Sequence, residues 1–165
     1  MYHINDVVVY GNQGVCKVMD VGPLDIMENE NKIYYTLNPV YQKGTTIYAP
    51  ADNPKSVIRP VLSKEQVNSL IKEIPDIETF CVRNDRDRES VYRTAIRTCD
   101  PRELVRILKT VYIRRKDRLA SGKKRIIVDE KYYQIAEDQL YQELAYVLDK
   151  KKESMEEYIT SNVSN

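Results

Sequence analysis

A length of 165 residues allows one domain or two small ones, and 42% hydrophobic with 31% charged residues is the balance of a globular rather than a disordered protein. No apolar run approaches the roughly 20 residues of a membrane helix, and the first residues lack the basic and apolar regions of a signal peptide, so we expect a cytoplasmic protein without a membrane partner. His3 is the only histidine, and the three cysteines are too widely spaced for a zinc site or a redox pair, which argues against a metal or another cofactor. We therefore expect a protein that is not an enzyme and has no small-molecule substrate.

Short strands are predicted throughout residues 1–61. Runs rich in β-branched and aromatic residues alternate with proline, glycine and asparagine, and no helical period interrupts them. The expected strands are 7–10, 15–21, 32–40, 45–49 and 56–59. Five such short strands favour a small β-barrel, which closes the edges of its own sheet.

The first two predicted strands flank Gly11-Asn12-Gln13-Gly14, a G-x-x-G pattern. In KH domains such a loop joins two helices and clamps a nucleic-acid backbone, and the phosphate-binding Walker and Rossmann loops lead into a helix. Here the neighbours on both sides are strands, and glycine and asparagine tolerate positive φ, so the pattern favours a hairpin turn. An RNA-binding module that acts through this loop is the alternative.

From Ser63 onward the apolar residues recur at helical spacing. Ser63 with Gln66 has the pattern of a capping box for a first helix, which Pro75 ends. Residues 86–98 favour a second helix, with apolar side chains three and four positions apart.

Two longer helices are predicted after it. Asp100 followed by Pro101 is a typical helix start, with an N-cap residue and a proline at the first helical position. Ser121-Gly122 breaks this helix, and we expect Asp129 to cap the last long one.

These patterns predict an α+β protein with two domains. The N-terminal barrel is expected over residues 1–61 and a C-terminal α-helical bundle over residues 62–150. Residues 151–165 are polar, and we expect them to form a frayed tail.

Positive charge is concentrated in residues 83–125. This zone holds 15 lysines and arginines against 6 acidic residues, a net charge of +9, although the whole chain carries only +1. The interleaved acids allow i,i+4 pairs, which would leave only a solvated helical surface. The excess of arginine instead favours contacts to the phosphates of a polyanionic partner, with little base readout. The residues expected to make these contacts are Arg86, Arg88, Arg93, Arg114, Arg115, Lys123, Lys124 and Arg125.

Several short motifs follow one another in a fixed order along residues 2–148. They are Asp6-Val7-Val8-Val9-Tyr10 with Gly14-Val15, Tyr48-Ala49-Pro50-Ala51-Asp52 with Ile58-Arg59-Pro60, Ala95-Ile96-Arg97-Thr98-Cys99-Asp100 with residues 104–109, and Arg114-Arg115-Lys116 with Asp129-Glu130-Lys131 and residues 136–145. Each motif is short, but together their order and spacing resemble the CarD/CdnL family of bacterial transcription regulators.

The resemblance implies a fold and two partners. In that family the N-terminal domain is a Tudor-like (SH3-like) barrel that binds the β subunit of RNA polymerase, similar to a domain of transcription-repair coupling factor. The helical domain contacts double-stranded promoter DNA at the upstream edge of the melted region, and the two domains together stabilise the open complex without catalysis. For this chain the resemblance implies polymerase contacts by Thr46, Ile47, Tyr48 and Asp25, and a place on the nucleoid through RNA polymerase.

Two features depart from the family pattern. Family members place a tryptophan wedge just before the first basic helix, whereas this chain has Asp85 there and no tryptophan at all, which leaves Phe80 as the nearest aromatic substitute. Asp25 and Tyr48 stand where family members carry basic residues toward polymerase, so we expect more strand-edge pairing and less salt bridging. Asp85 at the wedge position and the acids interleaved with the arginines favour an alternative, a protein-interaction adaptor that does not bind DNA.

Overall fold

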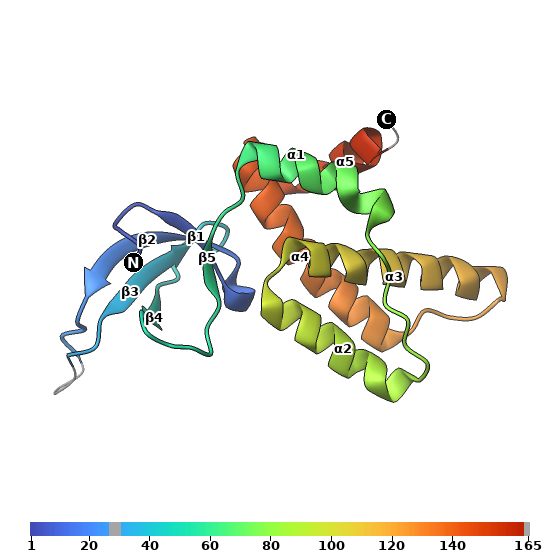
Figure 1. The fold of residues 1–165 in the computed structure, drawn as a ribbon, viewed down its shortest axis with the longest axis horizontal. Helices are drawn as coiled ribbons and strands as arrows, with labels where there is room; N and C mark the ends of the chain where they lie inside the picture. The colour runs from blue at the N-terminus through green and yellow to red at the C-terminus, as the bar shows by residue number, and fades with distance from the viewer. Residues whose placement is uncertain (27–30, 164–165) are drawn as a thin grey trace. The chain divides into compact units, whose positions relative to one another are not determined.

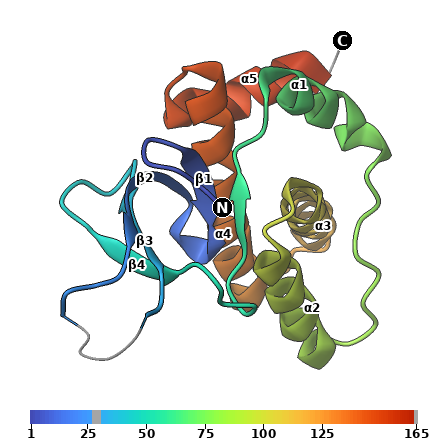
Figure 2. The ribbon, with the colours of Figure 1, turned by 60° about the vertical axis from the view of Figure 1, so that its left-hand side comes forward.

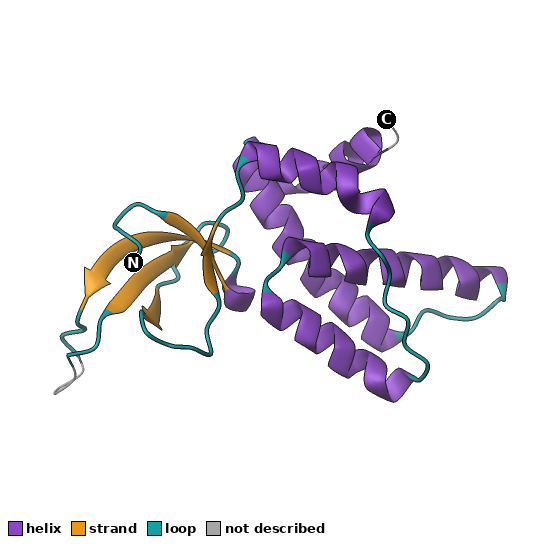
Figure 3. Ribbon diagram, in the orientation of Figure 1, coloured by secondary structure: helices purple, strands orange, loops and turns teal. Residues whose placement is uncertain are grey.

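The computed structural model describes residues 1–26 and 31–163 of the chain. The chain forms two compact units, Met1–Val61 and Leu62–Asn165. The described strands all belong to the first unit and the described α-helices to the second (Figure 3), which confirms the predicted α+β class. None of the described helices combines the length and the apolar character needed to cross a membrane.

The first unit is an antiparallel sheet. Its strands are β1 (Val7–Tyr10), β2 (Val15–Gly22), β3 (Tyr34–Pro39), β4 (Ile47–Pro50) and β5 (Ile58–Pro60). They pair in the order β4-β3-β2-β1-β5, so that β5 returns to the side of β1 (Figure 1). Because the described strands show no ladder between β4 and β5, closure of this sheet into a barrel stays a prediction.

One face of the sheet carries the core of this unit. Val8, Cys16, Val18 and Leu37 are fully buried and pack with Tyr35 and Ala49. Full burial of a valine or leucine side chain contributes about 1.5–3 kcal/mol to the free energy of folding. These buried residues are therefore the main source of stability in the sheet unit. The burial also raises the pKa of the Cys16 thiol to about 11, which keeps it neutral.

The G-x-x-G pattern is the turn of the β1–β2 hairpin. Val9 pairs with Val15 at its base, and Gly11–Gln13 form a short 3₁₀ turn. The Tyr10 N–H donates to the Gly14 carbonyl at 3.0 Å, and Gly14 has φ 76° and ψ −147°, a conformation that is essentially restricted to glycine. The hairpin prediction is confirmed, and the loop joins two strands rather than the two helices that flank the corresponding loop of a KH domain.

The second unit consists of packed helices. They are α1 (Lys64–Glu73), α2 (Asp85–Thr98), α3 (Pro101–Ala120), α4 (Ile127–Leu148) and α5 (Met155–Val163), with short 3₁₀ turns η2 (Ile74–Asp76) and η3 (Lys152–Ser154). α1 and α5 lie side by side in both ribbon views (Figures 1 and 2). The core is formed by apolar faces of all five helices and includes the fully buried Tyr92, Ile107, Leu140 and Leu144.

The predicted starts of α1 and α3 are confirmed. The Ser63 hydroxyl accepts from the Gln66 N–H, while the Gln66 side chain accepts from the Ser63 N–H at 2.8 Å, which completes the capping box. The Asp100 carboxylate caps α3 by accepting from the Arg102 N–H at 2.9 Å, and Pro101 occupies the first helical position.

The predicted start of α4 is wrong. This helix begins at Ile127 and its N-cap is Ile126, so Asp129 lies within the first turn. Asp129 is buried, and its carboxylate accepts from the Tyr92 hydroxyl and from Arg114. These contacts turn its side chain into the core, so Asp129 is not the N-cap residue of α4.

The expected frayed tail is also wrong. Residues 152–163 form η3 and α5, and Met155 is fully buried in the core of the helical unit. Tyr158, Ile159 and Val163 lie on the same helix face and pack against that core. Apolar residues three and four positions apart thus hold a mostly polar segment against α1 and α4.

Candidate functional site

Thr46, Ile47 and Tyr48 lie at the open edge of the sheet, where β4 pairs with β3 on one side only. The Ala51 N–H donates to the Ile33 carbonyl at 2.9 Å just beyond this pairing. Hydrogen-bonded positions alternate along an antiparallel pair. The Ala51 N–H faces β3, and Tyr48 is an odd number of residues from it, so the Tyr48 N–H and C=O point away from β3. The N–H and C=O of Thr46, two residues before Tyr48, point away from β3 as well.

The opposite edge of the sheet, at β5, is less accessible. The Tyr2 hydroxyl donates to the Ile58 carbonyl at 3.2 Å. Pro60, the last residue of β5, has no N–H to offer. Tyr48 by contrast exposes 48% of its surface. β4 therefore offers more backbone groups to a further strand than β5 does.

Asp25 is not a residue of β4. It is exposed in a turn that follows β2, next to the part of the chain that the structure does not describe. No hydrogen bond or ion pair of the described residues joins it to β4. Thr46, Ile47 and Tyr48 follow one another along the β4 edge, whereas Asp25 belongs to the turn after β2.

Arg88, one of the predicted phosphate ligands, is a buried residue of α2. Only 5% of its surface is exposed. Its guanidinium donates to the Val82 carbonyl at 2.9 Å and lies 3.4 Å from an oxygen of Asp85. The prediction that Arg88 contacts phosphate is therefore wrong, because the charge already has partners and faces the protein interior.

Arg114 is committed to a buried acid. Its Nε donates to an oxygen of Asp129 at 2.7 Å, and the other oxygen of that carboxylate accepts from the Tyr92 hydroxyl at 3.0 Å. Asp85 lies 3.6 Å away on the exposed side of Arg114. Burial raises the pKa of Tyr92 to about 12, so this hydroxyl remains a donor to Asp129. Arg114 thus joins α3 to α4 and to the start of α2.

Arg115 is held in a similar way one residue further along α3. Both oxygens of Glu130 accept from its guanidinium, one of them from Nε at 2.7 Å, and the guanidinium lies 3.8 Å from the ring centre of Tyr133. The hydrogen bond to Glu130 raises the pKa of Arg115, and the same bond lowers the pKa of Glu130. These contacts leave Arg115 only 23% exposed.

The remaining predicted cations are on the surface. Arg86 is exposed at the start of α2, and Lys123, Lys124 and Arg125 are exposed in the loop between α3 and α4. The Arg125 side chain is 71% exposed. Its guanidinium is 3.9 Å from an oxygen of Glu130, which is a long distance for an ion pair. Arg93 is 53% exposed and pairs with Glu89, which lies one turn earlier in the same helix. These five residues, unlike Arg88, can reach an external phosphate.

The wedge position has no exposed aromatic side chain. Asp85 is the first residue of α2 and is occupied with Arg88 and Arg114. Phe80 is half-buried against the core, and its ring and that of Tyr92 are in an edge-to-face arrangement with centres 6.3 Å apart. The Arg106 guanidinium lies 4.0 Å from the centre of the Phe80 ring. Phe80 is therefore a packing residue rather than a free wedge.

Two residues of α3 line a groove beside the loop, although neither was among the residues expected to bind phosphate or polymerase. Tyr112 follows the apolar stripe of α3, yet 52% of its surface is exposed. Lys116, one turn later, lies with its Nζ 4.7 Å from the Tyr112 ring centre. The i,i+4 spacing of an aromatic and a cationic residue was the available signal.

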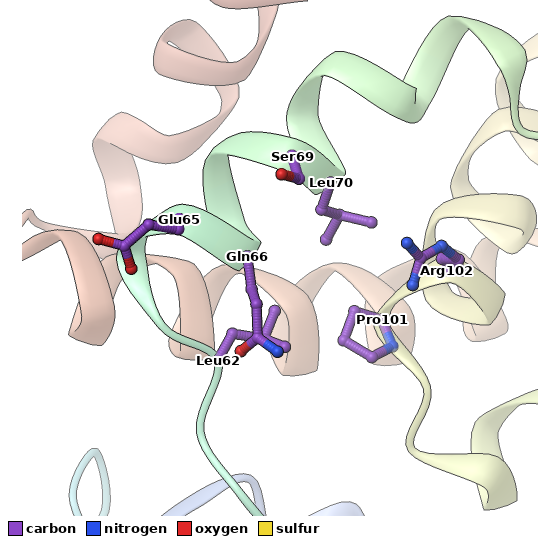
Figure 4. A pocket seen from close by; sticks show the side chains of 7 residues that line it. All are labelled: Leu62, Glu65, Gln66, Ser69, Leu70, Pro101 and Arg102. Carbon is purple, nitrogen blue, oxygen red and sulfur yellow. The ribbon is translucent and has the colours of Figure 1, made fainter.

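A separate cavity of about 240 Å³ opens between α1 and the start of α3. Figure 4 shows Leu70 and Pro101 at this cavity, while the Glu65 carboxylate points away from them. Arg102 is bound to Glu73 through two hydrogen bonds of 2.9 and 3.0 Å. Among the described residues, no group of three or more histidine, cysteine, aspartate or glutamate side chains is placed to hold a metal.

Residues 2–62 match the family model of the CarD-like/TRCF RID domain. This confirms the resemblance for the sheet unit, and the helical unit lies beyond the match. The matched domain interacts with the β subunit of RNA polymerase, which indicates a transcription-related role. A search of curated proteins found no match.

Proposed function

We propose that the chain is a transcription regulator that binds the β subunit of RNA polymerase through its N-terminal unit and the backbone of double-stranded promoter DNA through its helical unit. The match of residues 2–62 to an RNA polymerase-interacting domain is the observation that carries this proposal. The proposed activity is binding alone, without a catalytic step or a cofactor, and takes place in the cytoplasm on polymerase-bound DNA.

The proposed polymerase contact is strand addition at β4. Thr46 and Tyr48 present outward backbone groups, and main-chain hydrogen bonds are the source of affinity in this mode of recognition. Pro50 limits the contact because it lacks an N–H. The exposed Tyr48 ring adds contact area next to the new strand, as tyrosine does at many interfaces.

The strand-addition proposal is tested with Tyr48→Pro in the full chain. Proline removes an N–H that faces solvent, and edge strands tolerate proline at such positions, so the sheet is expected to stay folded. We expect affinity for a polymerase β-subunit fragment, measured by calorimetry, to fall about tenfold or more, because one main-chain hydrogen bond is lost and proline's ring obstructs the partner.

Two variants serve as controls. Ile47→Pro removes an N–H that faces β3 and should unfold the sheet, whereas Met19→Ala removes an exposed side chain of β2 and should leave binding unchanged. Wild-type affinity in a folded Tyr48→Pro chain would contradict strand addition at β4.

The proposed DNA contact uses the exposed cations Arg86, Lys123, Lys124 and Arg125. Three of them belong to one loop, and Asp85 at 3.6 Å from Arg114 brings the start of α2 against α3. Contacts of this type go to phosphate and carry little sequence information. Weak binding to DNA becomes effective once polymerase binding raises the local concentration of the helical unit.

The DNA contact is tested by changing Lys123, Lys124 and Arg125 to Gln together. The dependence of duplex affinity on salt should weaken, with the slope of log K against log salt falling by about 0.9 for each lost phosphate contact. The matched control changes Lys64, Lys72 and Lys151 to Gln, which removes the same charge from exposed positions elsewhere in the unit. Equal slopes for the two triple variants would overturn this assignment.

A protein-interaction adaptor that does not bind DNA is the second candidate. It is favoured by one observation, the pairing of Arg102, Arg114 and Arg115 with acids on other helices. This candidate predicts that duplex DNA is not retained even at low salt, so the same titration separates it from the first.

A further inference from the structure

A groove of about 300 Å³ lies beside the end of α3, and its lining combines positive charge with exposed aromatic surface. The last two turns of α3 form one wall, the loop that follows forms another, and Tyr133 of α4 and Glu156 of α5 complete the lining. Five cationic side chains face it, Arg115, Lys116, Arg118, Lys123 and Arg125. A groove of this size is at the small end of ligand sites in proteins, about 300–1,000 Å³.

The cations of this groove divide into fixed and available ones. Arg115 is held by Glu130 and Tyr133, and the Arg118 guanidinium donates to the Lys124 carbonyl, which ties the loop to α3. Lys116 and Lys123 are exposed, and their ammonium groups have no ion pair among the described residues. In this groove Arg115 and Arg118 are therefore fixed by contacts within the protein. Lys116 and Lys123 can bind an anion from solution.

Tyr112 supplies a stacking surface at the same groove. It is 52% exposed and precedes Lys116 by one helical turn, so the ring and the ammonium group lie on one face of α3. An exposed ring next to cations in a groove is the arrangement by which proteins hold unpaired nucleotides, with the base on the ring and the phosphate on the cations.

We propose that this groove binds one nucleotide of a single nucleic-acid strand, with its base against Tyr112 and its phosphate between Lys116 and Lys123. The inference goes beyond the proposed duplex contact, with which it shares Lys123 and Arg125, and it is independent of polymerase binding. A duplex offers the groove phosphates but keeps its bases stacked inside, so Tyr112 contributes only to binding of an unpaired strand.

The test compares Tyr112→Ala with Tyr112→Phe in the full chain. Binding of a fluorescein-labelled oligothymidine is followed by anisotropy at low salt. Tyr112→Ala should weaken it about fivefold to a hundredfold, the range that loss of one base-stacking partner produces, and Tyr112→Phe should bind as wild type because it keeps the ring. Tyr146→Ala, at another exposed tyrosine of the helical unit, should have no effect.

Further measurements separate this site from the duplex contact. They also show whether the bound nucleotide belongs to a nucleic-acid strand or is a free nucleotide. Duplex binding should be unchanged in Tyr112→Ala, whereas Lys116→Gln with Lys123→Gln should weaken binding of the single strand. Competition by thymidine monophosphate that is lost in Tyr112→Ala would support the same site with a free nucleotide as its ligand. Equal strand affinity of wild type and Tyr112→Ala, or an equal loss for strand and duplex, would overturn the proposal.

Discussion

Asp129 is buried where α2, α3 and α4 meet, and two side chains donate to its carboxylate. The Tyr92 hydroxyl is 3.0 Å from one oxygen and the Arg114 Nε is 2.7 Å from the other. The Asp129 side chain is 3% exposed and that of Arg114 is 25% exposed, so water does little to screen this pair. A buried carboxylate that loses its cation is strongly destabilising, whatever the net contribution of the intact pair.

Arg114→Leu is therefore expected to lower the free energy of unfolding of the helical unit by about 3 kcal/mol. Arg93→Leu removes an exposed arginine whose pair with Glu89 lies in solvent. This substitution should change the free energy of unfolding by less than about 1 kcal/mol. Urea unfolding followed by far-ultraviolet circular dichroism measures both values. Similar losses in the two variants would contradict a structural role for Arg114.

The pair between Arg115 and Glu130 predicts a dependence of stability on pH. The hydrogen bond from Arg115 lowers the pKa of Glu130 below its ordinary value of 4.5. A carboxylate with a lowered folded-state pKa stabilises the fold above its unfolded-state pKa, and this contribution is lost as pH falls through the folded-state value.

Glu130→Gln should therefore be less stable than wild type at neutral pH, and the difference should shrink as pH falls below about 4.5 and through the lowered folded-state pKa of Glu130. Urea midpoints of both proteins across this range test the prediction. A difference that stays constant with pH would show that packing, rather than charge, sets the effect of the substitution.

At the scale of the elements, α5 is the part of the fold that the sequence pattern concealed. Met155 is fully buried, and Tyr158 and Ile159 follow at helical spacing on the same face. The surrounding lysines, glutamates and serines dominate the composition of this segment, so it was predicted to fray. The periodicity was present, but it covers only two turns.

Met155→Ala is expected to destabilise the helical unit by about 2–5 kcal/mol, because it removes a fully buried side chain and leaves a cavity. Glu157→Ala changes an exposed residue of the same helix and should have an effect of less than about 0.5 kcal/mol. Urea unfolding of the full chain measures both. An equally small effect of Met155→Ala would mean that α5 does not contribute to the core.

Elements with local signals were predicted well. The β1–β2 hairpin follows from the glycines between two β-branched runs, and the starts of α1 and α3 follow from Ser63 and Asp100, whose partners lie two or three residues away. The start of α4 was missed because the partners of Asp129 lie on α2 and α3. A capping pattern does not reveal a carboxylate that is drawn inward by distant residues.

The open edge of the sheet was foreseen only in part. Tyr48 was expected to contact polymerase with strand-edge pairing, but which of its backbone groups point outward depends on the register of β3 and β4. A shift of one residue in that register would turn the backbone N–H and C=O of Tyr48 toward β3. The same groups of Ile47 would then point toward solvent. Pairing register is a property of two strands, and the sequence of one strand does not contain it.

At the scale of the whole molecule, charge is redistributed by folding. The basic zone 83–125 carries +9 along the chain, but Arg102, Arg114 and Arg115 pair with Glu73, Asp129 and Glu130, which all lie outside that zone. These partners are 15 to 29 residues away, beyond the i,i+4 pairs that a sequence displays. The count of charges along the sequence therefore located the positive charge in the helical unit, but it overstated the number of cations that are free to bind a partner.

The two units make separate contributions in the proposed function. The sheet unit supplies recognition of polymerase, and the loop between α3 and α4 supplies cations to DNA that polymerase has already bound. Neither contact alone is expected to change the life of an open promoter complex, because the duplex contact is weak and the polymerase contact does not touch DNA.

The lifetime of an open promoter complex, followed after addition of a competitor such as heparin, tests this account most directly. Wild-type protein should change that lifetime, and the change should vanish both for Tyr48→Pro and for the combined Gln substitution of Lys123, Lys124 and Arg125. An unchanged lifetime with wild-type protein, or a full effect from either variant, would contradict the joint action of the two units.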